Sequence, residues 1–139
     1  ATVAGRHGIV AKRWLGAPAP FILSLWDGAL EFEATDTDGK WSFNFRSPVA
    51  VKAGVWQHVA AVVTPGVGVT LYVDGRAIAS HENKLGRVAS MEPLVIGREA
   101  WSGINLSHEP CWFAGVLDDV KIWGRALSAD ELAAEARGG

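Results

Sequence analysis

Short stretches of alternating apolar and polar residues, each followed by a turn signal, constrain this chain more than any other feature of its sequence. Phe21, Leu23 and Leu25 fall on one face of a strand, and Asp27-Gly28 then gives a strong hairpin signal. Strands this short, with turns this frequent, predict an all-β sandwich or barrel. The same combination recurs at residues 30–33, 41–46, 59–64, 69–75 and 94–97.

The C-terminal end of the chain differs from this pattern. Residues 116–123 alternate like a strand, and we expect them to form a buried one. Ser128 and Glu131 then form a capping box, in which each side chain accepts from the other residue's amide. The sequence therefore predicts a short C-terminal helix, which begins at Ser128 and ends at Gly138-Gly139.

Length and composition limit the classes of partner. The 139 residues suit one domain, residues 1–139, and a hydrophobic content of 49% suffices for a core. A net charge of −2 does not favour nucleic acid as a partner. No apolar run approaches the roughly 20 residues that span a bilayer, so we expect no membrane insertion. The Ala-Thr-Val-Ala-Gly start, without an initiator Met, indicates a mature protein or an excised fragment.

Four motifs follow one another in a familiar order. They resemble the laminin G-like, concanavalin A-like superfamily of lectins and glucanases. That resemblance implies an antiparallel two-sheet jelly-roll sandwich with a short C-terminal helix, and it implies that Trp56 and Trp123 lie in the core. The motifs are Gly54-Val-Trp-Gln-His-Val-Ala60, Leu71-Tyr-Val-Asp-Gly75, Ile96-Gly97 and Phe113-Ala-Gly-Val-Leu-Asp-Asp-Val-Lys-Ile-Trp-Gly-Arg-Ala-Leu-Ser128.

The front of the chain departs from the superfamily pattern. Such domains carry further strands before a segment like Ile9-Val10-Ala11-Lys12, and those strands are shortened or absent here. Either the sandwich is a reduced version, or an exposed sheet edge is covered by a second copy or a neighbouring domain. We therefore expect homo-oligomerisation through that edge.

The carboxylates of the chain do not form a hydrolytic pattern. Glycoside cleavage with retention needs an acid and a nucleophile about 5 Å apart, and the nearest segment is Glu31-Phe32-Glu33. It lacks the rest of the glucanase pattern, so we interpret Glu31 and Glu33 as a solvated strand face. Neither a nucleophile elbow nor a zinc spacing is present. We expect His58 to bond a neighbouring group, and the chain is predicted not to be an enzyme.

Many relatives in the superfamily hold calcium on sandwich loops. Asp118 and Asp119 point to opposite faces, so one of them could coordinate a metal while the other faces solvent, and Asp118 is the candidate calcium ligand. The other interpretation is that this pair makes structural hydrogen bonds, because an isolated pair falls short of the 6–8 oxygens that calcium needs.

The resemblance implies a non-catalytic module that recognises a carbohydrate or a glycan-bearing surface, in a secreted or cell-surface protein. Sugar binding uses aromatic rings beside polar side chains. Trp101 with Asn105 and His108, in a long polar loop, is the first candidate site, and Trp26 with Asp27 at a hairpin tip is the second. The alternative function is that of a protein–protein interaction or assembly module. A shortened hydrolase is the third hypothesis.

Overall fold

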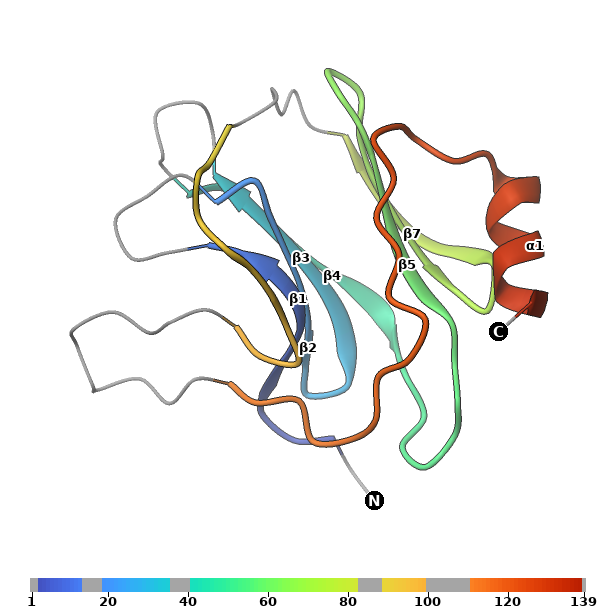
Figure 1. The fold of residues 1–139 in the computed structure, drawn as a ribbon. Coiled ribbons are helices and arrows are strands. Elements are labelled where there is room, and N and C mark those ends of the chain that lie inside the picture. The colour runs from blue at the N-terminus through green and yellow to red at the C-terminus, as the bar shows by residue number, and fades with distance from the viewer. Residues whose placement is uncertain (1–2, 14–18, 36–40, 83–88, 100–110, 139) are drawn as a thin grey trace.

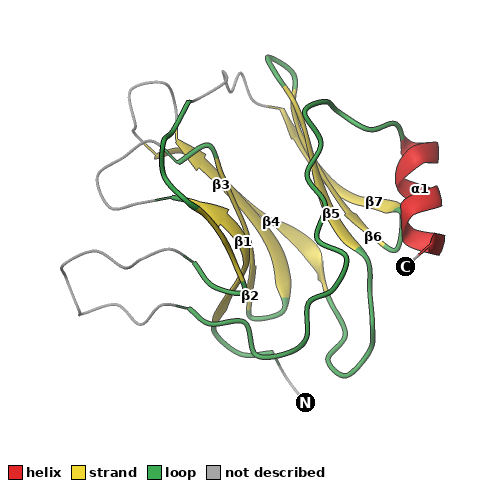
Figure 2. Cartoon of the chain, in the orientation of Figure 1, coloured by secondary structure: helices red, strands yellow, loops and turns green. Residues whose placement is uncertain are grey.

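Two antiparallel sheets and a C-terminal helix make up the described part of the chain (Figures 1 and 2). The structure is a computed structural model that describes residues 3–13, 19–35, 41–82, 89–99 and 111–138, except for the side chains of 41–43. Its elements are β1 (Arg6–Lys12), β2 (Phe21–Trp26), β3 (Ala29–Thr35), β4 (Trp41–Ala50), β5 (Val59–Thr64), β6 (Gly68–Val73), β7 (Arg76–Glu82), β8 (Leu94–Ile96) and α1 (Ala129–Gly138).

The two sheets differ in size. Within the described residues, one has five strands in the order β4-β3-β2-β1-β8, and the other has three in the order β5-β6-β7. They stack as two layers, and α1 lies beside the smaller sheet (Figure 1). The predicted all-β sandwich with a short C-terminal helix is confirmed.

The core lies between the layers and follows from the alternation in the sequence. Leu23 and Leu25 of β2 and Leu30 and Phe32 of β3 enter it from the larger sheet. Val69 and Leu71 of β6 meet them from the smaller sheet, and both are almost fully buried. Burying side chains of this size stabilises the fold by about 1.5–3 kcal/mol each.

Two Asp-Gly pairs close hairpins as the sequence predicts. Asp27 and Gly28 have φ values of 50° and 82°. Asp74 and Gly75 have φ values of 50° and 73°. Positive φ at both central residues is the type I′ pattern, whose twist matches that of the flanking strands.

The segment after β8 crosses the face of β1 that points away from the core. A Cβ on Gly8 would lie 2.2 Å from the Arg98 carbonyl carbon and from the Glu99 nitrogen, so only glycine allows this approach. The Gly97 amide donates to the Ile9 carbonyl at 2.9 Å, which fixes the start of the crossing. The crossing places the Glu99 side chain on that outer face.

The capping box of α1 is present. The Ser128 amide donates to Glu131 Oε2 at 2.8 Å, and the Glu131 amide donates to Ser128 Oγ at 3.2 Å. The helix packs against the β6–β7 turn, since a Cβ on Gly75 would lie 2.8 Å from the Ala133 Cα. Among the residues that the structure describes, no helix is long and apolar enough to cross a membrane.

The predicted buried strand at residues 116–123 is wrong. The segment forms no strand, and Val116 is 71% exposed and Ile122 56% exposed. Trp56 and Trp123 are not core residues either, because Trp56 is 69% exposed and Trp123 is also exposed. Among the described residues, no backbone hydrogen bond pairs this segment with a strand, and an apolar alternating pattern forms a strand only when such a pairing exists.

Candidate functional site

The outer face of the five-stranded sheet carries acidic residues that are buried. Strand β3 sends Leu30 and Phe32 to the core, and it therefore sends Glu31 and Glu33 to the opposite face. The expectation that these two carboxylates form a solvated face is wrong, because the Glu31 side chain is 0% exposed and Glu33 is also buried. A buried carboxylate needs partners, and the neighbouring strands provide them.

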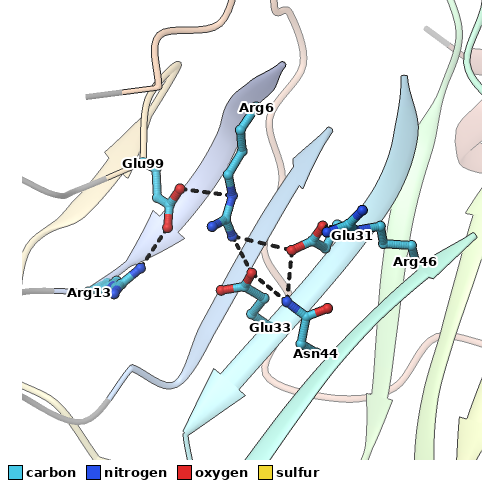
Figure 3. A network of polar contacts seen from close by, with 7 residues as sticks. All are labelled: Arg6, Arg13, Glu31, Glu33, Asn44, Arg46 and Glu99. Atoms are coloured by element: carbon cyan, nitrogen blue, oxygen red, sulfur yellow. Dashed lines mark hydrogen bonds and ion pairs between the residues drawn. The ribbon is translucent and has the colours of Figure 1, made fainter. Parts of the chain in front are cut away.

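Three side chains converge on the two carboxylates from either side of β3 (Figure 3). Arg46 on β4 donates from Nε to Glu31 Oε2 at 2.5 Å. Asn44, also on β4, donates from Nδ2 to Glu31 Oε1 at 2.9 Å and to Glu33 Oε1 at 2.7 Å. Arg6 on β1 forms ion pairs with both carboxylates, at 3.4 Å to Glu31 and at closer range to Glu33.

Glu99 extends the arrangement across β1. Its Oε1 accepts from Arg13 Nη1 at 2.6 Å, and its Oε2 lies 3.0 Å from Arg6 Nε. Arg6 thus links Glu99 on one side to the β3 carboxylates on the other (Figure 3). We call these seven residues the outer polar cluster: Arg6, Arg13, Glu31, Glu33, Asn44, Arg46 and Glu99.

The two β3 carboxylates have opposite pKa shifts. Burial raises the pKa of Glu33 to about 8, and hydrogen bonding with Glu31 adds to this rise while Arg6 opposes it. Burial acts in the same direction on Glu31, but hydrogen bonding with Glu33 and the charges of Arg6 and Arg46 outweigh it and lower its pKa. At neutral pH the pair therefore holds one proton, on Glu33, and one negative charge, on Glu31.

The cluster is closed at one end and open at the other. Glu99 and Arg13 are buried at the end where the segment after β8 crosses β1, whereas the Arg46 side chain is 42% exposed and Asn44 is also exposed. With Glu33 protonated, its three arginines face two charged carboxylates, so the cluster carries a net positive charge. This positive charge is therefore exposed to solvent at the β4 side of the outer face.

Trp26 lies at this open end. The Arg46 guanidinium lies over its ring at 4.1 Å from the centroid, and the Arg6 guanidinium lies at 5.2 Å. Such cation–π contacts hold the indole in place, and the ring is partly exposed. The structure thus joins Trp26, a predicted site residue, to the outer polar cluster.

The other predicted binding residues do not join it within the described part of the chain. Asp27 is exposed in the β2–β3 turn, where its Oδ1 accepts from the Gly5 amide at 2.8 Å and so fixes the N-terminal segment. Trp101, Asn105 and His108 lie outside the described residues. The loop site therefore stays a prediction.

Asp118 is exposed and bonds locally. Its Oδ1 accepts from the Asp119 amide at 2.8 Å, and Asp119 has a φ of 49°. Among the described residues, no group of three or more His, Cys, Asp or Glu side chains could hold a metal ion. Calcium binding through Asp118 stays a prediction.

His58 bonds through its backbone. Its amide donates to Asp74 Oδ1 at 3.0 Å, and its carbonyl accepts from the Asp74 amide at 2.8 Å. Its ring Nδ1 is buried and has no hydrogen-bond partner in the part of the chain that the structure describes. The expected side-chain bond is therefore absent there.

The sequence does hold a signal for the outer polar cluster. Glu31 pairs with Arg46 and Glu33 pairs with Asn44 in the β3–β4 register, so opposite charges and polar groups meet on one face. That signal can be recognised only once the register is known, and the register of this strand pair shifts on both sides of these two pairs. The contribution of Glu99 has no comparable signal, because it depends on the crossing over Gly8.

Comparison with protein families agrees with the fold. Residues 5–133 match a laminin G-type family model described as the concanavalin A-like lectin/glucanases superfamily. The chain belongs to this superfamily, and the resemblance predicted from the motifs is confirmed.

The individual proteins that this chain resembles share 30% or less of its sequence over the matched regions. The human adhesion G-protein coupled receptor D1 is 30% identical over 111 residues, which cover 76% of this chain and 11% of the receptor. The solved structure of the Ruminococcus gnavus IT-sialidase CBM40 bound to α2,3-sialyllactose is 19% identical, with a TM-score of 0.75, and the match covers 96% of this chain and 75% of that one. An S-layer domain-containing protein of Clostridium thermocellum is 24% identical, with a TM-score of 0.50 over 96% of this chain and 64% of that one. The chain thus spans a small part of the receptor and less than two thirds of the S-layer chain.

Proposed function

We propose that the chain is a non-catalytic module that binds a carbohydrate at the open end of the outer polar cluster. The observation that carries the proposal is the Trp26 ring, which is partly exposed and stacked under Arg46. Asn44 adds an exposed polar group on the same strand as Arg46. We infer that these three residues form the contact surface.

The chemistry of this surface suits a pyranose. An indole face packs on the apolar C–H side of a sugar ring, and amide and guanidinium donors bond its hydroxyl groups. The Glu31 and Glu33 carboxylates hold Arg46 and Asn44 in one geometry before any ligand arrives. Such preorganisation lowers the conformational entropy lost on binding.

The positive charge favours a sugar with a carboxylate. Three arginines outnumber the charged glutamates of the cluster at neutral pH, and a guanidinium can bond a carboxylate through two parallel N–H groups. The R. gnavus module, which has the same fold, is bound to α2,3-sialyllactose. Acidic glycans are therefore the first ligands to test, and we infer a secreted or cell-surface location for the module.

The state of the carboxylates supports binding without catalysis. Glu33 has a raised pKa and Glu31 a lowered one, as an acid and a nucleophile of a glycosidase would. However, both are buried and already bonded to Arg6 and Asn44. A carboxylate buried in this way lacks the access to a sugar that nucleophilic attack requires.

A glycan array with matched tryptophan variants tests the proposal. Trp26→Ala is expected to lose at least tenfold in affinity for any glycan that the wild type binds, since one stacked ring contributes about 1.4 kcal/mol or more. Trp112→Ala is the matched control, because Trp112 is also an exposed tryptophan beside an arginine, with Arg98 at 5.4 Å from the ring centroid. Its binding is expected to equal that of the wild type.

The same array separates the two candidate sites. If Trp101→Ala abolishes binding and Trp26→Ala leaves it intact, the sugar binds at the polar loop and the outer-face site is wrong. If the wild type binds no glycan, with or without calcium, the carbohydrate function itself is wrong. Circular dichroism of each variant checks that loss of binding does not reflect unfolding.

A second candidate function is that of a protein–protein interaction module. Exposed apolar residues at 116–123 and at Val55-Trp56 favour it, because soluble proteins seldom expose such side chains in groups without a partner. Both functions are compatible, since this surface is separate from the outer polar cluster in sequence and in its contacts.

A further inference from the structure

The carboxylates of Glu31 and Glu33 bond to the same two donors (Figure 3). Asn44 Nδ2 donates to Glu31 Oε1 at 2.9 Å and to Glu33 Oε1 at 2.7 Å. Arg6 Nη2 also contacts both oxygens, at 3.4 Å on Glu31 and at closer range on Glu33. Two buried carboxylates that share their donors repel each other when both are charged, so this geometry favours one proton on the pair.

The surroundings of Glu33 place that proton on it. Burial raises its pKa to about 8, and Glu31 and Glu99 act in the same direction, whereas the charge of Arg6 opposes them. Strand β2, on one side of Glu33, has no ionisable side chain. The charged groups around Glu33 in the described part of the chain are Arg6 and Arg13 on β1, Glu31 on β3, Arg46 on β4 and Glu99 after β8.

Glu33 is buried, but its partners extend to the open end of the outer polar cluster. Asn44, which bonds Glu33 directly, is exposed. Arg46 donates from Nε to Glu31, and its side chain is 42% exposed. No described residue accepts a hydrogen bond from either Nη atom of Arg46. These two Nη groups are therefore available to a ligand, and Glu31 connects their guanidinium to Glu33.

The proton on Glu33 decides the charge of this open end. At the closed end Arg13 and Glu99 form an ion pair at 2.6 Å, so their charges offset each other. The two other arginines then face the two carboxylates of β3. With Glu33 neutral, two positive charges face one negative charge, and the open end is positive. With Glu33 ionised, the charges balance.

We propose that Glu33, as a neutral acid, gives this surface a preference for glycans with a carboxylate over uncharged glycans, and that loss of its proton removes the preference. The inference rests on the proposed carbohydrate function. The carboxylate of the glycan binds the free Nη groups of Arg46, whose guanidinium suits two parallel bonds. Glu33 is buried and acts on the glycan through its charge and through Asn44, so it is a positioning residue.

The affinity for an acidic glycan is expected to fall as pH rises. Glu33 holds its proton below its pKa of about 8 and loses it above that value, where a second carboxylate charge then repels the glycan. One such added charge weakens binding about three- to tenfold at the effective dielectric of a partly exposed site. An uncharged glycan is not repelled, so its affinity is expected to stay constant.

Calorimetry with a charged and an uncharged form of one glycan tests the proposal. The probes are α2,3-sialyllactose and its amide, in which an uncharged group replaces the carboxylate. The wild type is expected to bind the acid more tightly than the amide at about pH 6.5. At about pH 9.5 the ratio of the two affinities is expected to fall about three- to tenfold. Circular dichroism at both pH values checks that the chain is folded.

Two glutamine variants assign the effect to its residue. Glu33→Gln is expected to keep the ratio of the two affinities constant between the two pH values, because the amide side chain has no proton to lose there. Glu135→Gln is the matched control, since it neutralises a carboxylate of α1 that bonds Lys121 away from the outer face. It is expected to show the pH dependence of the wild type.

A titration of the wild type without ligand follows the proton directly. The ¹³Cδ resonance of Glu33 is expected to shift near pH 8, and this result does not depend on whether Glu33→Gln folds. A Glu33 carboxylate that is already ionised at about pH 6.5 would overturn the proposal.

The binding data distinguish failure of this proposal from failure of the proposed function. If both probes bind but the ratio of their affinities is the same at both pH values, Glu33 does not set the preference, and the carbohydrate site stands. If neither probe binds at either pH, the choice of acidic glycans in the proposed function is wrong, and the proposal about Glu33 fails with it.

Discussion

Single ionisable residues in the outer polar cluster give the sharpest tests. Glu33 has a pKa of about 8 in the folded chain against an ordinary value of 4.5, so between these pH values the folded state binds one more proton than the unfolded state. The free energy of unfolding therefore falls as pH rises through this window, by up to about 1.4 kcal/mol per pH unit. Glu31 adds nothing to this slope, because its lowered pKa keeps it charged in both states there.

Glu33→Gln is expected to remove this contribution, since the amide resembles the protonated acid. Urea unfolding of both proteins across the window measures it: the stability of the variant relative to the wild type should increase steadily with pH. Every other ionisable group is common to both proteins, so its contribution cancels in the difference. A difference that is constant with pH would show that Glu33 is ionised in the folded chain.

Glu99 is the residue whose loss should cost most. It is the counter-charge of the buried Arg13 at 2.6 Å and of the partly buried Arg6 at 3.0 Å. Glu99→Ala leaves both guanidinium groups without it, and removing one partner of a buried pair costs about 3–5 kcal/mol. Chemical denaturation measures this loss. Glu135→Ala, which removes an exposed partner of Lys121, is the control and should change stability little.

At the scale of elements, the crossing of β1 by residues 98–99 depends on one glycine. Gly8→Ala puts a Cβ 2.2 Å from the backbone of the crossing segment, so one of the two chains must shift. We expect a loss of about 1–3 kcal/mol, typical of overpacking, and a weaker Arg13–Glu99 pair. Thermal unfolding measures it. Gly124→Ala is the control, because a Cβ there meets no atom within 4 Å, and equal losses in both variants would contradict the close crossing.

The elements themselves could be predicted wherever local chemistry decides them. The hairpin at Asp27-Gly28 and the cap at Ser128 depend on residues close in sequence, and both are present. Residues 116–123 have the same local pattern as a strand, but a strand also needs a neighbour. The alternation of residues 116–123 does not show whether a strand pairs with them, so it could not predict whether Trp123 is buried.

The functional site was harder to predict than the fold for a related reason. Trp26 could be named from its type and its position beside a turn. The outer polar cluster around it gathers side chains from β1, β3, β4 and the segment after β8, which are separated by up to 93 positions between Arg6 and Glu99. Alternation places Glu31 and Glu33 on the same face of β3, but it does not predict whether that face is exposed to solvent.

At the scale of the whole molecule, the two sheets differ in how well they are buried. Strands β2 and β3 are buried on both faces, by the core and by the outer polar cluster. Strands β5 and β7 have only partly buried or exposed residues. Amide exchange in native conditions reports such differences, because less buried units open at a lower free energy than the whole fold.

We therefore expect the smaller sheet to open before the larger one in the isolated chain. Native-state hydrogen exchange at low denaturant should give the highest opening free energies for β2 and β3, lower values for β5 and β7, and an intermediate value for β6, whose Val69 and Leu71 are buried. If all strands instead exchange at one common free energy, the sheets unfold as one unit.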